Sequence, residues 1–151
     1  MNRLRTPTLD RGFSLIEVLV SIVVLSVGLL GAAALQVGGL RVGQSSFYRA
    51  QAAQFAADMA DRLRANIGEA RTCTLAITAS TPTSPTTACG RDLAEWRARL
   101  GTLPGGTGAV AVQPNVVNNM DLVTITVRWD DSRGGGATAS DLVLVTTLRR
   151  P

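Results

Sequence analysis

Hydrophobic and polar positions divide the chain into two unlike parts, and the first is a long apolar run. From Phe13 to Leu35 the sequence contains no Lys, Arg, Asp or Pro, and Glu17 is its only charged residue. At 1.5 Å per residue, about 23 residues make a helix of roughly 34 Å, long enough to cross a hydrocarbon core of about 30 Å. A carboxylate within such a segment costs on the order of 3 kcal/mol. We therefore expect Glu17 to have a partner.

Positive charge lies on the N-terminal side of this run. Arg3, Arg5 and Arg11 all precede Phe13. Because basic residues are retained on the cytoplasmic side, this bias predicts a cytoplasmic N-terminus and an extracytoplasmic location for everything after Leu35.

The next segment, residues 36–68, is amphipathic. Three glycines at 38, 39 and 43 weaken a helix there, but apolar residues then recur at spacings of three and four. This stripe consists of Tyr48, Ala52, Phe55, Met59, Leu63 and Ile67. The pattern predicts one helix from Phe13 to Ile67, ended by Gly68 as its C-cap, whose second half packs against a globular head.

Residues 69–151 form that head and carry one further helix signal. Asp92 can cap the first turn of a helix, Glu95 completes a pattern like a capping box, and Gly101 ends the segment.

Three strand patterns follow, at residues 108–113, 122–129 and 141–148. Consecutive strands with such links predict an antiparallel sheet, whose Val/Ile row would pack on the helical stripe. The fold class is therefore α+β. Asp130 and Asp131 lie in the last connection, where we expect a solvated turn.

The two cysteines, Cys73 and Cys89, bracket a polar segment rich in Thr and Pro. In an exported domain such a pair favours a disulfide, and closing a loop of about 15 residues is worth roughly 3 kcal/mol. Free redox thiols would favour a C-x-x-C spacing, and two ligands are too few for a metal site.

The segment G-F-S-L-I-E-V-L-V, beginning at Gly12, resembles the class III signal of type IV pilins and the related pseudopilins. The resemblance implies a pilin-like fold and a leader, residues 1–12, that prepilin peptidase removes after Gly12. It also implies that Phe13 becomes N-methylated and that Glu17, fifth in the mature chain, pairs with the Phe13 amine of a neighbour. Its partners would be the peptidase, other minor and major pilins and, before assembly, the inner membrane. The head would lie in the periplasm and later on a surface fibre.

Two plainer interpretations of the apolar run remain. Ala32 and Ala34 could supply the small-x-small site of a conventional signal peptide, or the run could be a simple single-span anchor. Neither explains a glutamate within the run or the Gly12–Phe13 pair at its boundary.

The head also resembles the minor pilins of the type IV pilus modification protein (PilV) family. The resemblance rests on D-L-x-x-W from Asp92, L-P-G-G-x-G from Leu103 and I-T-V-R-W-D-D ending at Asp131. It implies a low-abundance subunit that helps initiate or cap type IV pilus assembly, supporting adhesion and twitching motility. The alternatives are a minor pseudopilin of type II secretion and a DNA-binding pilin. The DNA-binding alternative would depend on Arg128, Arg133, Arg149 and Arg150.

Composition argues against catalysis. The chain has 151 residues, with 15 basic residues that are all Arg, no His, and a net charge of +4. Without His, the usual neutral-pH base and the commonest metal ligand are missing. We expect no enzyme activity, cofactor, metal or small-molecule substrate.

Overall fold

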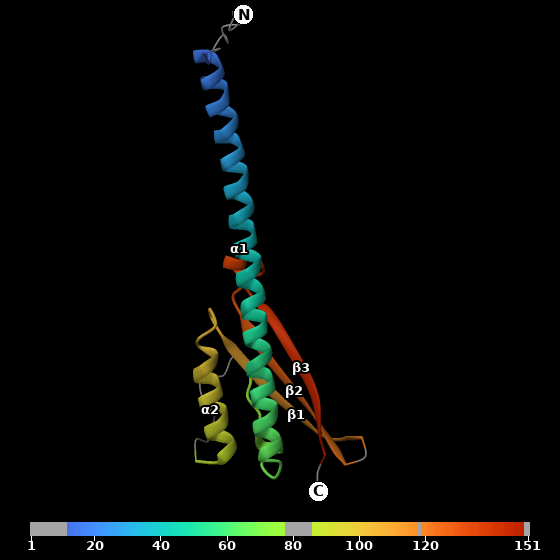
Figure 1. The fold of residues 1–151 in the computed structure, drawn as a ribbon. Helices are drawn as coiled ribbons and strands as arrows, with labels where there is room; N and C mark the ends of the chain where they lie inside the picture. Colours follow the sequence, from blue (N-terminus) through green and yellow to red (C-terminus); the bar gives the residue numbers. More distant parts are fainter. Residues whose placement is uncertain (1–11, 78–85, 118, 150–151) are drawn as a thin grey trace, which may run out of the picture. The chain divides into compact units, whose positions relative to one another are not determined.

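The computed structural model describes residues 12–77, 86–117 and 119–149 (Figure 1). The elements in these ranges are α1 (Leu15–Ala65), η1 (Ala70–Thr72), α2 (Ala88–Leu100), β1 (Thr107–Val117), β2 (Met120–Trp129), η2 (Ser132–Gly134) and β3 (Ser140–Arg149). Contacts divide the chain into two units, Met1–Gly39 and Leu40–Pro151, and α1 contributes to both. The long N-terminal helix and small sheet are the α+β, pilin-like architecture that the sequence predicts.

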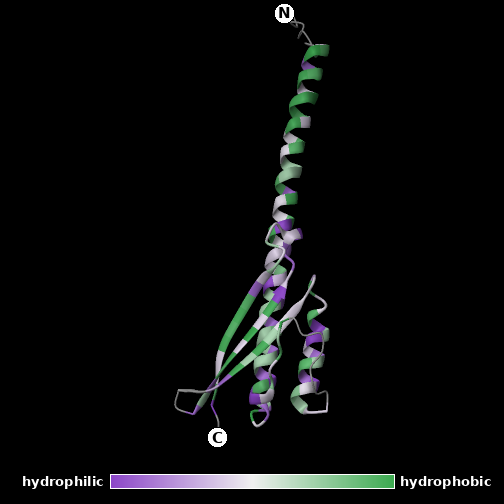
Figure 2. Cartoon of the chain, turned by 180° about the vertical axis from the view of Figure 1, so that it is seen from behind, coloured by the Kyte–Doolittle hydropathy of each residue, from purple (hydrophilic) through white to green (hydrophobic). Residues whose placement is uncertain are grey.

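The first unit is the apolar half of α1. The helix begins at Leu15, two residues after the predicted start at Phe13. Hydrophobic residues predominate along this half (Figure 2). Their large apolar side chains are exposed, from 85% at Leu15 to 47% at Val18. By length and composition this is the one helix in the described ranges that could cross a membrane. Exposure on all sides is what a lipid-facing helix requires.

The second unit contains an antiparallel sheet in the order β1-β2-β3. β2 and β3 pair without interruption from Met120 opposite Arg149 to Trp129 opposite Ser140. β1 and β2 pair regularly up to Gln113, beyond which the register shifts. The three predicted strands are therefore confirmed, and each is longer than predicted.

The core lies between the sheet and the second half of α1. On β2, Val123, Ile125, Val127 and Trp129 are all buried, and the residues between them are only half-buried. The α1 residues that face this row are those of the predicted stripe, from the partly buried Tyr48 to the buried Leu63. The last residue of the predicted stripe, Ile67, is partly buried and lies in the turn after α1. Burying each large apolar side chain contributes about 1.5–3 kcal/mol, so this contact accounts for much of the head's stability.

α2 begins four residues earlier than the sequence predicted. Its N-cap is Thr87, whose hydroxyl accepts a hydrogen bond from the Gly90 amide at 2.9 Å, and not Asp92. The predicted capping box is wrong because the carboxylates of Asp92 and Glu95 bind Arg62 of α1 instead. The predicted end at Gly101 is confirmed.

Two contacts attach α2 to α1. The indole N–H of the fully buried Trp96 donates to the Phe55 carbonyl at 2.8 Å. The Arg62 guanidinium binds both oxygens of Glu95, at 3.0 and 3.1 Å, and also reaches Asp92 and Asp58. The first contact is a buried indole held by a hydrogen bond, and the second is a set of ion pairs.

α1 ends at Ala65, and Gly68 is not its C-cap. The chain turns over residues 66–69, where the Asn66 side chain donates to Asp92 at 3.0 Å. The helix therefore ends before Gly68, at a residue held by α2.

The connection between β2 and β3 differs from the predicted solvated turn, because Asp131 is fully buried. Its Oδ2 accepts a hydrogen bond from the Ser45 hydroxyl of α1 at 2.6 Å, and its main-chain oxygen accepts from the Gly134 and Gly136 amides. A Cβ at Gly136 would lie 2.5 Å from Oδ2, so glycine is needed for this close approach. Asp131 organises the connection and joins it to α1.

Gly108 should be the most sensitive glycine at the α2–β1 contact. A Cβ there would lie 2.4 Å from Cη2 of Trp96 and 2.6 Å from Cδ1 of Leu100. We expect Gly108→Ala to lower the free energy of unfolding by about 1–3 kcal/mol through overpacking. Chemical denaturation would measure it, with Gly68→Ala as the control because no atom lies within 4 Å of its added Cβ. Equal stabilities for the two variants would contradict this packing.

The Arg62–Glu95 pair predicts a pH dependence of stability. The hydrogen bond from Arg62 is the main reason that the pKa of Glu95 lies below its usual value of 4.5. A lowered folded-state pKa means that the stabilisation is complete above about pH 4.5 and is lost as the pH falls through the folded-state value. Unfolding measured between pH 6 and about 3 should therefore show a shallower loss of stability for Glu95→Gln than for the unmodified chain. Parallel curves would show that the pair does not couple folding to pH.

Candidate processing and assembly site

The candidate site is the start of α1, where Gly12, Phe13 and Ser14 precede the first helical turn. The Ser14 carbonyl accepts hydrogen bonds from the amides of Glu17 and Val18, at 3.0 and 3.2 Å, and so opens the helix. Glu17 lies in this first turn, where a negative charge is favoured by the helix dipole. The local fold thus tolerates a carboxylate that lipid alone would reject.

Gly12 and Phe13 are accessible. Phe13 is 83% exposed, and a Cβ added to Gly12 would meet no atom within 4 Å. The fold therefore does not require glycine at position 12. A requirement for glycine there would come from an enzyme that must approach this backbone closely.

Phe13 and Glu17 share a shallow hollow of about 290 Å³ on the helix surface. The other lining residues are Val18, Ser21, Ile22 and Leu25. The hollow is mostly apolar, with the carboxylate at one side. Its composition suits an apolar partner segment that carries one positive charge.

Glu17 differs from every other acidic residue in the described ranges. Each of the others accepts a hydrogen bond or forms an ion pair, whereas the Glu17 carboxylate has neither among the described residues. The next charged residue along the chain is Arg41, more than six helical turns away. No basic residue of α1 is therefore close enough to neutralise Glu17. The basic residues that precede α1 are among residues 1–11, which lie outside the described residues.

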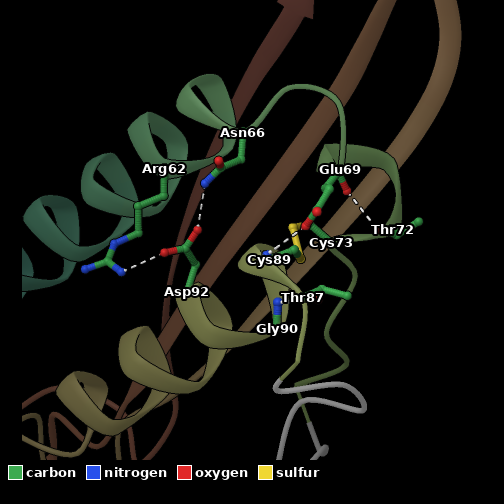
Figure 3. The surroundings of a disulfide bond; sticks show 9 residues. All are labelled: Arg62, Asn66, Glu69, Thr72, Cys73, Thr87, Cys89, Gly90 and Asp92. Carbon is green, nitrogen blue, oxygen red and sulfur yellow. Dashed lines mark hydrogen bonds and ion pairs between the residues drawn. A yellow bond between two sulfur atoms is a disulfide. The ribbon is translucent and has the colours of Figure 1, made fainter.

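The predicted disulfide is present in the structure (Figure 3). Cys73 follows η1 and Cys89 lies in the first turn of α2, with a Cα–Cα distance of 5.6 Å. Both are buried, and the Glu69 carboxylate accepts a hydrogen bond from the Cys89 amide. The disulfide therefore fixes the start of α2 to the segment after α1. The intervening Thr/Pro loop, residues 78–85, lies outside the described residues.

Of the four arginines considered for DNA binding, Arg128 and Arg149 lie near opposite ends of the sheet. Arg128 is paired with Asp141, with nitrogen–oxygen distances of 2.6 and 2.7 Å. Arg149 is opposite Met120, eight residues along β2 from Arg128, which is roughly 26 Å. Trp129, the nearest aromatic residue in sequence, is buried. Arg150 lies outside the described residues.

One comparison with known proteins gives a match at this site. Residues 8–33 match the model of the prokaryotic N-terminal methylation motif. This range includes Gly12, Phe13, Glu17 and most of the apolar run. No curated protein and no solved structure matches the chain.

The motif indicates a type IV pilin-like or pseudopilin protein. It implies processing by prepilin peptidase and assembly with other pilins, and with the apolar helix it fits membrane anchoring and a pilus fibre.

Processing at this site gives a direct prediction. Gly12 is the only glycine at the boundary between the basic and apolar segments, so the mature chain should begin at an N-methylated Phe13. Intact-mass analysis of the protein isolated from its host would measure the start. A start near Leu35 would instead establish a conventional signal peptide. Replacing Gly12 with a bulky residue should leave the leader attached.

Proposed function

We propose that this chain is a minor pilin, a structural subunit that helps initiate or cap type IV pilus assembly. The observation that carries the proposal is Glu17, which lies within the methylation motif and is the one described carboxylate without a partner. Every other described acid has at least one hydrogen-bond or ion-pair partner within the head. A group that the chain leaves unpaired is available to another chain.

Removal of the leader would supply the partner. Cleavage after Gly12 creates a positively charged amine on Phe13, and methylation retains that charge. In an assembled bundle of N-terminal helices, the amine of one subunit would neutralise Glu17 of its neighbour. Breaking a buried ion pair costs about 3–5 kcal/mol. A subunit at the wrong axial height would leave both charges unpaired, so the pair sets the axial register between subunits.

The head supports a structural role and not a catalytic one. Its charged groups form ion pairs between elements, such as Arg62 with Glu95 and Arg128 with Asp141. We propose that the head is exported to the periplasm while α1 remains in the inner membrane. The assembled subunit would then reach the cell surface in a fibre.

The choice of a pilus over a type II secretion pseudopilus rests on sequence resemblance in the head. The motifs beginning at Asp92 and Leu103 and the one ending at Asp131 resemble those of the PilV-like minor pilins. In the structure they form α2, the turn before β1, and the end of β2. Adhesion and twitching motility are the processes that such a subunit would support.

Glu17→Val tests the proposed assembly role. The substitution removes the only carboxylate from the apolar run, so membrane insertion should be unchanged or improved. Processing should continue, because Gly12 and Phe13 are retained. The variant should therefore accumulate as mature protein in the membrane and be nearly absent from sheared pili, because the neighbour's amine would lose a partner worth about 3–5 kcal/mol.

The matched control is Ser21→Val, one turn further along in the same hollow, where no charge is removed. Quantitative mass spectrometry of sheared fibres and membranes would compare the variants. Glu17→Val protein entering fibres at the level of the unmodified chain would contradict the proposed role of Glu17. Absence of the unmodified chain from pili, with presence in a secretion pseudopilus, would favour the alternative class.

A further inference from the structure

The outer edge of β3 is open. β3 is the last strand of the sheet, and its only strand partner in the described ranges is β2. No backbone hydrogen bond from another described segment reaches Ser140–Arg149. Alternate N–H and C=O groups along ten residues therefore face away from the sheet without a backbone partner.

This edge lacks the features by which proteins usually prevent strand pairing. Such features are lysines, prolines, bulges and short edge strands. β3 pairs with β2 without a bulge, and residues 142–148 contain no charged residue, proline or glycine. The strand is long, regular and uncharged in its middle.

Both faces of β3 are incompletely covered. Val143 and Val145 point away from the core and are each 56% exposed. Leu142 and Leu144 pack against the core but are only partly buried. A further strand beside β3 would cover side chains on both faces while satisfying the backbone edge.

The charges at the two ends of β3 are unequal. Asp141 is neutralised by the two hydrogen bonds from Arg128, which lower the pKa of its carboxyl group. Arg149 is exposed and has no ion-pair partner in the described residues. A complementary strand would be apolar in the middle and acidic beside Arg149.

We propose that the outer edge of β3 binds an extended strand of a different pilin-like subunit, which continues the sheet across the subunit boundary. Only an extended backbone satisfies a row of alternating donors and acceptors, and this mode of recognition is β-strand addition. The inference rests on the proposed function, because it takes the partner from the subunits that assemble with this chain.

A second copy of this chain fits less well. Antiparallel pairing of two β3 strands would place Asp141 opposite Arg149, but Asp141 already binds Arg128. Such a pair would leave Arg149 of each copy beside a carboxylate that is already neutralised. A strand that brings a free acidic residue beside Arg149 fits this edge better, so the partner is a different subunit.

The test uses the full chain in its host and compares Val145→Lys with Ala111→Lys. Both positions are exposed on the outer face of the sheet, and both pair with Thr124 of β2. Ala111, however, is in β1, two strands away from the proposed edge. We expect Val145→Lys to reduce recovery in sheared pili by about tenfold, while Ala111→Lys leaves it unchanged. The membrane level and the absence of reactive thiols would show that each variant is folded.

A second measurement does not depend on an introduced charge. A photo-crosslinking amino acid placed at 145 should give a product with an edge-strand peptide of another protein that has the methylation motif, and the same group at 111 should not. Equal recovery of the two Lys variants, crosslinking to a second copy, or the same product from both positions would overturn the proposal. Recovery of the unmodified chain in pili reports separately on the proposed function.

Discussion

The head depends on the burial of one stripe of α1 against the inner face of β2. β2 contributes Val123, Ile125 and Val127, all fully buried, and α1 contributes Met59 and Leu63. Each further part of the head is attached to one of these two elements. α2 packs on α1 through Trp96, and the connection after β2 is held to α1 at Ser45 by Asp131. Loss of this contact would remove the surface on which the rest of the head is assembled.

The sequence of α1 changes character near Gly38 and Gly39. Before these residues, apolar side chains occur on all sides, and no internal contact buries them. After them, burial is confined to one stripe, and arginines and aspartates occupy much of the remainder. The same element can therefore be a lipid-facing anchor over one half and the central support of a water-soluble head over the other.

Much of the fold could be predicted from the sequence, because its signals are local and periodic. The helical stripe and the alternation in β2 each identify a buried face from spacing alone. The errors concern contacts between distant residues. Asp92 and Glu95 have the spacing of a capping box, but Arg62, about 30 residues earlier, binds both carboxylates. Likewise, nothing near Asp131 in sequence indicates that Ser45 would bury it.

The candidate site differs from the head because its residues are close together in the sequence. The motif around Gly12, Phe13 and Glu17 could be identified from the sequence because its residues are adjacent. The structure adds the contrast between Glu17 and the head. In the head, Asp58, Asp121 and Asp141 each bind an arginine of the same chain.

At a surface in contact with water, an unpaired carboxylate costs little free energy, but it contributes nothing to specificity. In hydrocarbon, by contrast, an unpaired carboxylate at Glu17 would have a high free-energy cost, and a correctly placed cation would reduce that cost. Among the described residues, each acid of the head has at least one partner, whereas Glu17 in the apolar run has none. Under the proposed function, this contrast marks Glu17 as the position where a neighbouring subunit would supply the missing cation.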